Sequence, residues 1–403
     1  LILGILIFDI LLERGLDYLN KTRMTDPLPT ELQDIYDSEK YLKQQAYEKE
    51  NSRFKFITST FSFSLLILML ALNGFSYADA AVRTFSENPI IQALIFFGTL
   101  MFLMDIVNTP FDIYDTFVIE AKYGFNTTTI KTYILDKLKG WMLAIVVGRL
   151  LLGLIIWFIL AFPSTFWLMA WAVVSVFMIF MAMFYSSLIV PLFNKQTPLE
   201  DGELKQAINE FSSNVGFKLD NIYVIDGSKR STKANAYFSG LGAKKRIVLY
   251  DTHIKEMTTC EIVAVVAHEI GHYKKKHVLS MIGISVLQTG LMFYILGYFI
   301  NQPALSQALG ASQPSIHLSL IAFGVLYTPL SMLIGILLNK LSRKNEYEAD
   351  NFAAQHYNGK ELVSALKKLS AKNLSNLTPH PLYVFFHYSH PTLLQRINNL
   401  MKK

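Results

Sequence analysis

Long apolar blocks, separated by polar segments, constrain the fold of this chain more than any other feature of its sequence. Six blocks have roughly the 20 residues that an α-helix needs to cross the hydrocarbon core of a bilayer. These blocks are 56–78, 89–107, 141–162, 164–190, 278–300 and 316–338. A shorter apolar run, 1–12, is interpreted as the end of a further transmembrane helix. The pattern therefore predicts an all-α multi-pass membrane protein with about seven transmembrane helices.

The composition agrees with a membrane protein, because 52% of the residues are apolar and only 17% are charged. The net charge of +6 is modest and scattered along the chain, which favours loops that face anionic lipid. We therefore predict the lipid bilayer as a partner and no nucleic acid. The single cysteine, Cys260, excludes an intramolecular disulfide and is predicted to be a small buried residue.

The polar segments fall on two sides if successive apolar blocks cross the membrane in alternating directions. One side receives nearly all the lysines and arginines, in 13–55, 108–140, 191–277 and the tail. The other side receives 83–88, the turn at Pro163 and the uncharged segment 301–315. The positive-inside rule makes the basic side cytoplasmic.

Four parts of the chain follow from this topology. Residues 1–190 hold five transmembrane helices with their cytoplasmic loops, 191–277 form a soluble α+β segment, 278–338 form the last two transmembrane helices, and 339–403 form a cytoplasmic tail. Within the first part, we expect an amphipathic helix near 34–52 outside the membrane and a polar connection at 108–140.

A short motif in the soluble segment carries the clearest chemistry. His268, Glu269 and His272 form an H-E-x-x-H pattern within 261–277, a run that is apolar, free of proline and typical of a helix. Residues four apart lie on one face of a helix, so the two imidazoles can bind one metal ion. Glu269 lies about 100° around the helix, where it can reach a water on that metal. Zinc is the predicted ion, although a chance match on an amphipathic helix remains an alternative for this motif alone.

A third ligand is predicted from the segment after the last apolar block. Glu346 and Asp350 are four residues apart, so a helix places both on one face. Glu346 can complete the zinc site, and Asp350 can hold a ligand imidazole through its second nitrogen. A solvated acidic helix face is the alternative for this pair alone. Because an antiparallel pair of membrane helices separates the two motifs, both return to the same side. We expect the His268 helix to continue through the lysines at 274–276 into the next membrane helix.

A small sheet is predicted beside the metal helix. Segments 221–225 and 246–250 are rich in β-branched residues, which is typical of strands. The residues between them that are candidates for substrate binding are Asn235, Ala236, Tyr237 and Phe238. The edge of such a sheet can bind an extended peptide by backbone pairing, and an ordinary hairpin is the equal alternative.

The order of these motifs is similar to that of a known family. The chain has H-E-I-G-H at 268–272, N-E-Y-E-A-D at 345–350, A-N-A-Y-F at 234–238 and S-H-P at 389–391 followed by Arg396. It resembles the type I CAAX prenyl endoproteases, which are multi-pass zinc metalloproteases, and the resemblance covers essentially the whole chain. One difference is visible, because Lys233 and Ala234 stand where the family often has His-Ser.

The resemblance implies both a fold and roles for individual residues. It implies a seven-helix barrel around a large water-filled chamber, closed on the cytoplasmic side by the metalloprotease domain. It implies that His268, His272 and Glu346 bind one Zn²⁺ and that Glu269 is the catalytic base. It further implies that His390 stabilises the oxyanion, that Asp350 and Arg396 support the site, and that Asn235 belongs to the substrate strand.

The predicted function is hydrolysis of a peptide bond near the C-terminus of a prenylated substrate. A quality-control protease of the HtpX type, which needs no prenyl group, is an alternative within the same class. A transporter or receptor, with Asp105 and Arg149 on a solute path, is an alternative from another class, and an inactive zinc-bearing scaffold is a third. We expect the bacterial inner membrane in preference to the endoplasmic reticulum, because the loops are compact.

Overall fold

The computed structural model describes residues 1–218, 222–240 and 245–402, and it is mostly helical. Within these residues, six helices are long and apolar enough to cross a membrane. They correspond to the six apolar blocks of the sequence and comprise α2 (Ser38–Ala71), α4 (Pro89–Tyr114), α5 (Ile130–Ala161), α6 (Phe166–Leu188), α11 (His277–Phe299) and α13 (Ile316–His356). The run 1–12 lies in α1 (Ile2–Thr22), which packs against α13. That this helix also crosses the membrane stays a prediction.

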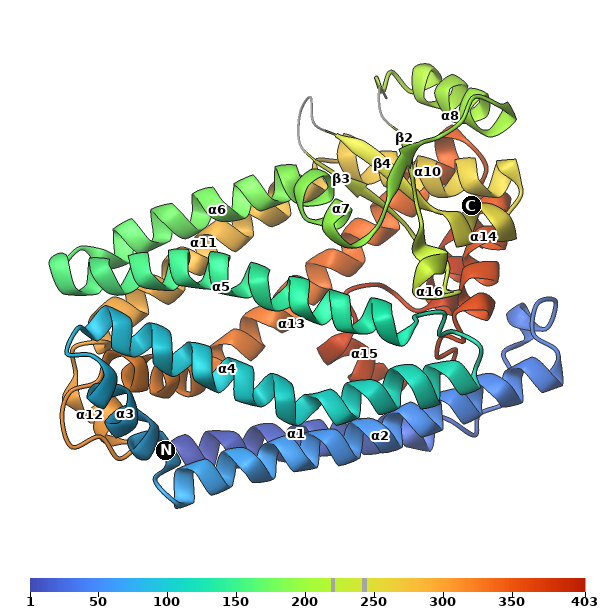
Figure 1. The fold of residues 1–403 in the computed structure, drawn as a ribbon. Coiled ribbons are helices and arrows are strands. Elements are labelled where there is room, and N and C mark those ends of the chain that lie inside the picture. The colour runs from blue at the N-terminus through green and yellow to red at the C-terminus, as the bar shows by residue number, and fades with distance from the viewer. Residues whose placement is uncertain (219–221, 241–244, 403) are drawn as a thin grey trace.

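The long helices lie side by side, and the shorter elements gather at their two ends (Figure 1). α3 (Gly74–Phe85) and α12 (Pro303–Gln307) lie at one end. The sheet lies at the other end together with α7 (Val190–Phe193), α8 (Glu203–Asn214), α10 (Thr259–Lys274), α14 (Gly359–Lys372) and α16 (Leu393–Met401). The remaining short elements are η1 (Thr30–Leu32), η2 (Asp115–Glu120), η3 (Gly227–Lys229), α9 (Asp251–Glu256) and α15 (Pro381–His387).

Helices in the first half of the chain extend well beyond their apolar blocks. The predicted outer helix near 34–52 continues into the block 56–78 as one helix, α2, which begins after the cap Asp37 and ends at Ala71, and the last residues of that block lie in α3. The predicted connection 108–140 is also mostly helical, because α4 continues through η2 and α5 begins at Ile130. The helix predicted near 34–52 is thus confirmed, but its separation from the next apolar block was wrong, because a helix satisfies its own backbone hydrogen bonds. It therefore need not end where the side chains become polar.

The sheet has four strands in the order β1-β2-β4-β3. Their bounds are β1 (Gln196–Pro198), β2 (Ile222–Ile225), β3 (Ala236–Ser239) and β4 (Arg246–Tyr250). β2 and β4 are the two predicted strands, and Asn221 lies outside the described residues. β2 pairs with β4 in parallel, whereas β3 pairs with β4 in antiparallel register, with Ala236 opposite Leu249. β3 is therefore an edge strand.

The sheet and α10 share one hydrophobic core. Residues 262–267 of α10 are buried without interruption, as are Ile247, Val248 and Leu249 of β4. Ile208 of α8 and Leu362 of α14 belong to the same cluster. A helix that is apolar on all sides is stable only when other elements surround it. The metal motif therefore lies on the central helix of the domain.

Two differences from the sequence predictions affect the motif helices. α10 does not continue into the membrane helix. It ends at Lys274, Lys276 has φ +59° in the left-handed region, and α11 begins anew at His277. α13, in contrast, is continuous over 41 residues, so the predicted boundary between residues 338 and 339 lies inside it. At 1.5 Å per residue, Glu346 lies about 12 Å beyond Leu338 along this helix.

Candidate metal centre and active site

Close packing of α10 against α13 brings the two sequence motifs together. A Cβ atom at Gly271 would lie 3.1–3.2 Å from Phe352 and from the backbone of Ala349, so only glycine permits this approach. The start of α10 is fixed by a capping box between Thr258 and Glu261. Gly271 lies between His268 and His272 in the sequence, so its lack of a side chain allows the close approach of the two helices beside the ligand groups.

Three side chains converge where the two helices meet. His268 and His272 of α10 and Glu346 of α13 form the one cluster in the described part of the chain that could hold a metal ion. The two Nε2 atoms are 3.1 Å apart. His268 Nε2 lies 3.4 Å from Glu346 Oε2, and His272 Nε2 lies 3.2 Å from Glu346 Oε1. The structure thus places all three predicted ligands within reach of one ion.

These distances fit a tetrahedral metal site. Bonds of about 2.0–2.1 Å in a tetrahedron separate neighbouring ligand atoms by about 3.3 Å, which is the spacing observed. Glu346 Oε2 is buried and has no hydrogen-bond partner among the described residues, as expected for an oxygen that a metal would satisfy. Cys260 is not part of this cluster. It is exposed near the start of α10, so the prediction that it is buried was wrong.

A carboxylate and an arginine hold the first histidine. Asp350 is fully buried, and its Oδ1 lies 2.9 Å from His268 Nδ1. Arg396 Nε donates to Asp350 Oδ2 over 2.9 Å, and Arg396 Nη1 lies 3.6 Å from Glu346 Oε2. Burial alone would lower the pKa of the His268 imidazole, but hydrogen bonds to Asp350 and Glu346 outweigh it and raise the pKa to about 9. The carboxylates around His268 therefore favour positive charge at this point.

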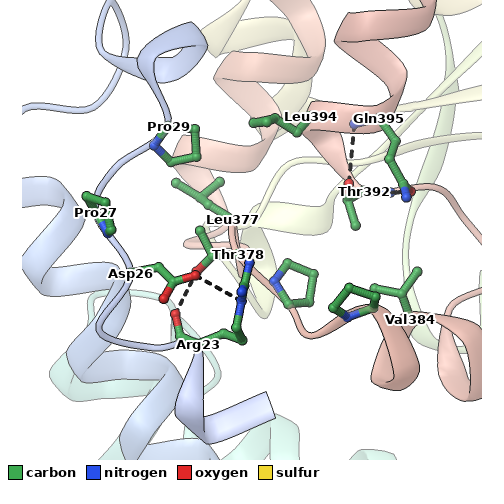
Figure 2. A pocket seen from close by; sticks show the side chains of 12 residues that line it. Arg23, Asp26, Pro27, Pro29, Leu377, Thr378, Val384, Thr392, Leu394 and Gln395 are labelled. Atoms are coloured by element: carbon green, nitrogen blue, oxygen red, sulfur yellow. Dashed lines mark hydrogen bonds and ion pairs between the residues drawn. The ribbon is translucent and has the colours of Figure 1, made fainter. Parts of the chain in front are cut away.

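The start of α16 fixes the position of Arg396. Thr392 and Gln395 form a capping box, in which Thr392 Oγ1 accepts from the Gln395 backbone and Gln395 Oε1 accepts from the Thr392 backbone. Figure 2 shows these two residues on the wall of a hollow of about 360 Å³ between the C-terminal segment and the segment after α1. On the opposite wall, Thr378 donates to the Arg23 carbonyl over 3.1 Å. The C-terminal segment is thereby anchored to the N-terminal helices.

His390 lies at the open side of the metal cluster. Its Nε2 is 3.3 Å from Glu346 Oε1, its Nδ1 is 2.9 Å from Ser389 Oγ, and 63% of its side chain is exposed. Glu269 follows His268 on α10 and is only partly buried. Both residues are thus next to the ligands and accessible from outside the core.

The edge strand β3 and one of the metal ligands, His272, line a cavity of about 940 Å³. Asn235, Tyr237 and Phe238 contribute from the β3 segment, and His272 contributes from α10. Helices α6 and α11 form an apolar wall with Met181, Ala182, Val278, Met281 and Ile282. Ala236 belongs to β3 but is not among the lining residues. A peptide on this edge would therefore lie between the sheet and a hydrophobic surface.

Two groups of residues around the site were not predicted from the sequence. The first group is His277 and Glu348. His277 Nδ1 lies 3.1 Å from His272 Nδ1, and His277 Nε2 lies 3.1 Å from Glu348 Oε2. Lys233, which was noted only as a difference from the family, donates to Glu120 Oε2 over 2.7 Å and to the Tyr47 hydroxyl over 2.9 Å. Lys233 thereby ties the segment before β3 to α2 and η2. No spacing rule in the sequence connects these residues.

Asp105, which the transporter alternative places on a solute path, is paired within the helix bundle in this structure. Asp105 accepts hydrogen bonds from Lys137 Nζ over 2.8 Å and from Trp141 Nε1 over 3.0 Å. A carboxylate paired in this way holds α4 to α5. The fold and the site together define a membrane-embedded metallopeptidase with its ligands on two crossing helices.

Comparisons with known proteins identify the family within this class. A family model described as "CAAX prenyl protease N-terminal, five membrane helices" matches residues 17–195, and one described as "Peptidase family M48" matches 198–403. The chain is 35% identical to CAAX prenyl protease 1 of Saccharomyces cerevisiae, over 93% of this chain and 88% of the relative. It is 36% identical to the CAAX prenyl protease 1 homolog of Arabidopsis thaliana, over 98% and 96% respectively.

A solved structure agrees with these matches. The crystal structure of S. mikatae Ste24p superimposes with a TM-score of 0.92 at 34% identity, covering 99% of this chain and 97% of that chain. The chain therefore belongs to the CAAX prenyl protease family of M48 peptidases, and it is a membrane-embedded metalloendopeptidase. The resemblance stated from the sequence motifs is confirmed.

Proposed function

We propose that this protein is a zinc endopeptidase that cleaves a peptide bond near the C-terminus of prenylated CAAX-type substrates. The observation that carries the proposal is the convergence of His268, His272 and Glu346 at tetrahedral spacing beside an accessible Glu269. The relatives named CAAX prenyl protease 1 supply the substrate class. Zinc is the ion that best fits two imidazoles and one carboxylate with a further position open.

The roles of the residues follow from their positions. Zinc in this site would polarise the scissile carbonyl and lower the pKa of a water to about 7. Glu269 takes the proton of the attacking water and passes it to the leaving amine. His390 donates to the carbonyl oxygen as negative charge develops on it. Asp350, held by Arg396, keeps His268 Nδ1 protonated and its Nε2 directed at the ligand cluster.

The substrate binds as an additional strand in this proposal. The free edge of β3 offers backbone groups to an extended peptide, and the ends of Asn235 and Tyr237 face the same cavity as His272. The apolar wall of α6 and α11 is suited to a prenyl chain, and 940 Å³ is at the upper end of ordinary ligand cavities, about 300–1,000 Å³.

The membrane arrangement is proposed from the same relatives. Seven membrane helices, with α1 as the first, enclose a water-filled chamber, and the active site faces the cytoplasm. The relatives come from a yeast and a plant, which favours the endoplasmic reticulum over the bacterial inner membrane expected from the compact loops.

The test compares two substrates and two proteins. The purified wild type should bind one zinc per chain and release the last three residues of a farnesylated reporter peptide. Glu269→Gln should bind the same amount of zinc and lose nearly all turnover. Equal cleavage of the unprenylated twin would favour a quality-control protease, and rapid turnover by Glu269→Gln would remove the assigned mechanism.

A further inference from the structure

A second chain of hydrogen bonds, separate from that of Asp350, leads away from the metal cluster. His272 Nδ1 lies 3.1 Å from His277 Nδ1, and His277 Nε2 lies 3.1 Å from Glu348 Oε2. The His277 residue is only 5% exposed, whereas the Glu348 side chain is 38% exposed. The contacts from Glu348 to His277 and from His277 to His272 thus connect the solvent-accessible surface of α13 to the metal cluster.

The break between α10 and α11 creates this contact. In an uninterrupted helix, residues five apart point about 140° away from each other, so His277 could not reach His272. The left-handed conformation of Lys276 ends α10 and starts α11 in a new direction. As a result the two imidazole ring centroids are 5.1 Å apart, with their planes at 74°.

Only one arrangement of protons satisfies all the contacts when the imidazoles are neutral. His272 Nε2 faces Glu346 and must keep its lone pair free for a metal, so its proton is on Nδ1. His272 Nδ1–H then donates to His277 Nδ1. His277 carries its own proton on Nε2 and donates it to the Glu348 carboxylate. Because one nitrogen of His277 accepts a hydrogen bond and the other donates to a carboxylate, these contacts fix the orientation of its buried ring.

We infer that His277, held by Glu348, is a positioning residue that fixes the tautomer and ring orientation of His272 for metal binding. This inference rests on the proposed zinc site. It assigns each metal-binding histidine its own carboxylate, because Asp350 contacts His268 directly and Glu348 acts on His272 through His277. The two ligands therefore differ, since the support of His272 includes a partly exposed carboxylate.

Three variants of the full-length protein separate positioning from general packing. His277→Phe keeps a planar ring but removes the acceptor. His277→Asn keeps an acceptor, because Asn Oδ1 occupies nearly the place of His Nδ1. Glu348→Leu removes the carboxylate from a partly exposed position where misfolding is not expected. Lys360→Gln, an exposed change at the start of α14, is the control.

The measurement is zinc affinity by competition with a chromophoric chelator, together with the d–d absorption bands after cobalt(II) replaces zinc. We expect His277→Phe and Glu348→Leu to bind zinc about 10–100-fold more weakly, as removal of such supporting contacts does elsewhere. Their cobalt spectra should shift, and activity should recover in excess zinc. His277→Asn, which keeps the acceptor but lacks the nitrogen that contacts Glu348, should bind zinc more tightly than His277→Phe, and Lys360→Gln should match the wild type.

Each other outcome overturns the inference. Wild-type affinity in both Glu348→Leu and His277→Phe would mean that the contact does not support His272. Equal weakening in the Phe and Asn variants would mean that the acceptor is not what matters. Where His277→Phe fails to fold, Glu348→Leu decides. A wild type that binds no zinc would instead refute the proposed metal site, which distinguishes the two failures.

Discussion

Replacing Gly271 by alanine tests whether close packing of α10 on α13 sets the geometry of the metal centre. The new Cβ would lie 3.1 Å from Phe352 Cβ and 3.2 Å from two backbone atoms of Ala349. Ordinary contact begins at 3.4 Å, so the helices must separate locally by about 0.2–0.3 Å. Metal–ligand distances tolerate about ±0.2 Å. The displacement is therefore as large as the tolerance, and it occurs one residue from His272.

The size of the effect can be bounded against a matched glycine. Overpacking of a core typically costs about 1–3 kcal/mol, whereas alanine in a helix interior is more stable than glycine by about 0.5–1 kcal/mol. A Cβ atom added at Gly335 of α13 would have no atom within 4 Å. Gly335→Ala should therefore gain helix stability without any overpacking cost. The gain is common to both variants and cancels in their comparison, so the overpacking cost alone makes Gly271→Ala about 2 kcal/mol less stable than Gly335→Ala.

The assay is thermal unfolding of both variants in the same detergent, with zinc affinity measured alongside. Gly271→Ala should unfold a few degrees below Gly335→Ala and bind zinc about tenfold more weakly. Gly335→Ala should bind zinc like the wild type. If Gly271→Ala is as stable as Gly335→Ala and binds zinc equally well, the contact between the helices does not set the site.

Two further predictions concern residues outside the metal cluster. Lys233→Met should raise KM about tenfold with little change in kcat, because the segment before β3 loses its hydrogen bond to Glu120. The measurement is steady-state kinetics, and an unchanged KM would exclude this role of Lys233. His253 is fully buried, and burial lowers the pKa of its imidazole to about 4. Below about pH 6.5, His253 is protonated in the unfolded chain but stays neutral in the folded chain. The free energy of unfolding therefore falls between about pH 6.5 and 4, by about 3 kcal/mol in all. His253→Phe should flatten this slope in unfolding experiments across that range, and an unchanged slope would contradict the assignment.

The sequence predicted the membrane class and the ligand set because both depend on local periodicity. A block of about 20 apolar residues implies a membrane helix whatever surrounds it. Histidines four apart on a helix share a face in any fold, so His268 and His272 needed only the helix. Glu346 required one further step, the return of the chain through a pair of membrane helices. The structure brings these three residues together within hydrogen-bonding distances.

The helix boundaries were predicted poorly because hydropathy shows where side chains change from apolar to polar. It does not show where the backbone leaves the helical conformation. α2 continues from a polar to an apolar stretch without a glycine or proline between residues 50 and 56, so nothing ends it. The opposite error occurred at Lys276. No proline or glycine marks this position, and a run of three lysines is compatible with a helix, yet the backbone adopts a left-handed conformation there.

This unpredicted break is what makes the surroundings of the metal centre asymmetric. α13 continues beyond its apolar block as one helix of 41 residues, and it carries Glu346 and Asp350 about one turn apart on one face, with Glu348 between them in the sequence. α10 and α11, in contrast, are separate pieces that meet at Lys276. The continuous helix can fix carboxylates in register over a long distance, whereas the broken pair lets His277 turn back onto His272. A straight α10–α11 helix would keep the ligands His268 and His272 but would leave His272 without support at its second nitrogen. The geometry of the site therefore depends both on the continuity of α13 and on the end of α10 before Lys276.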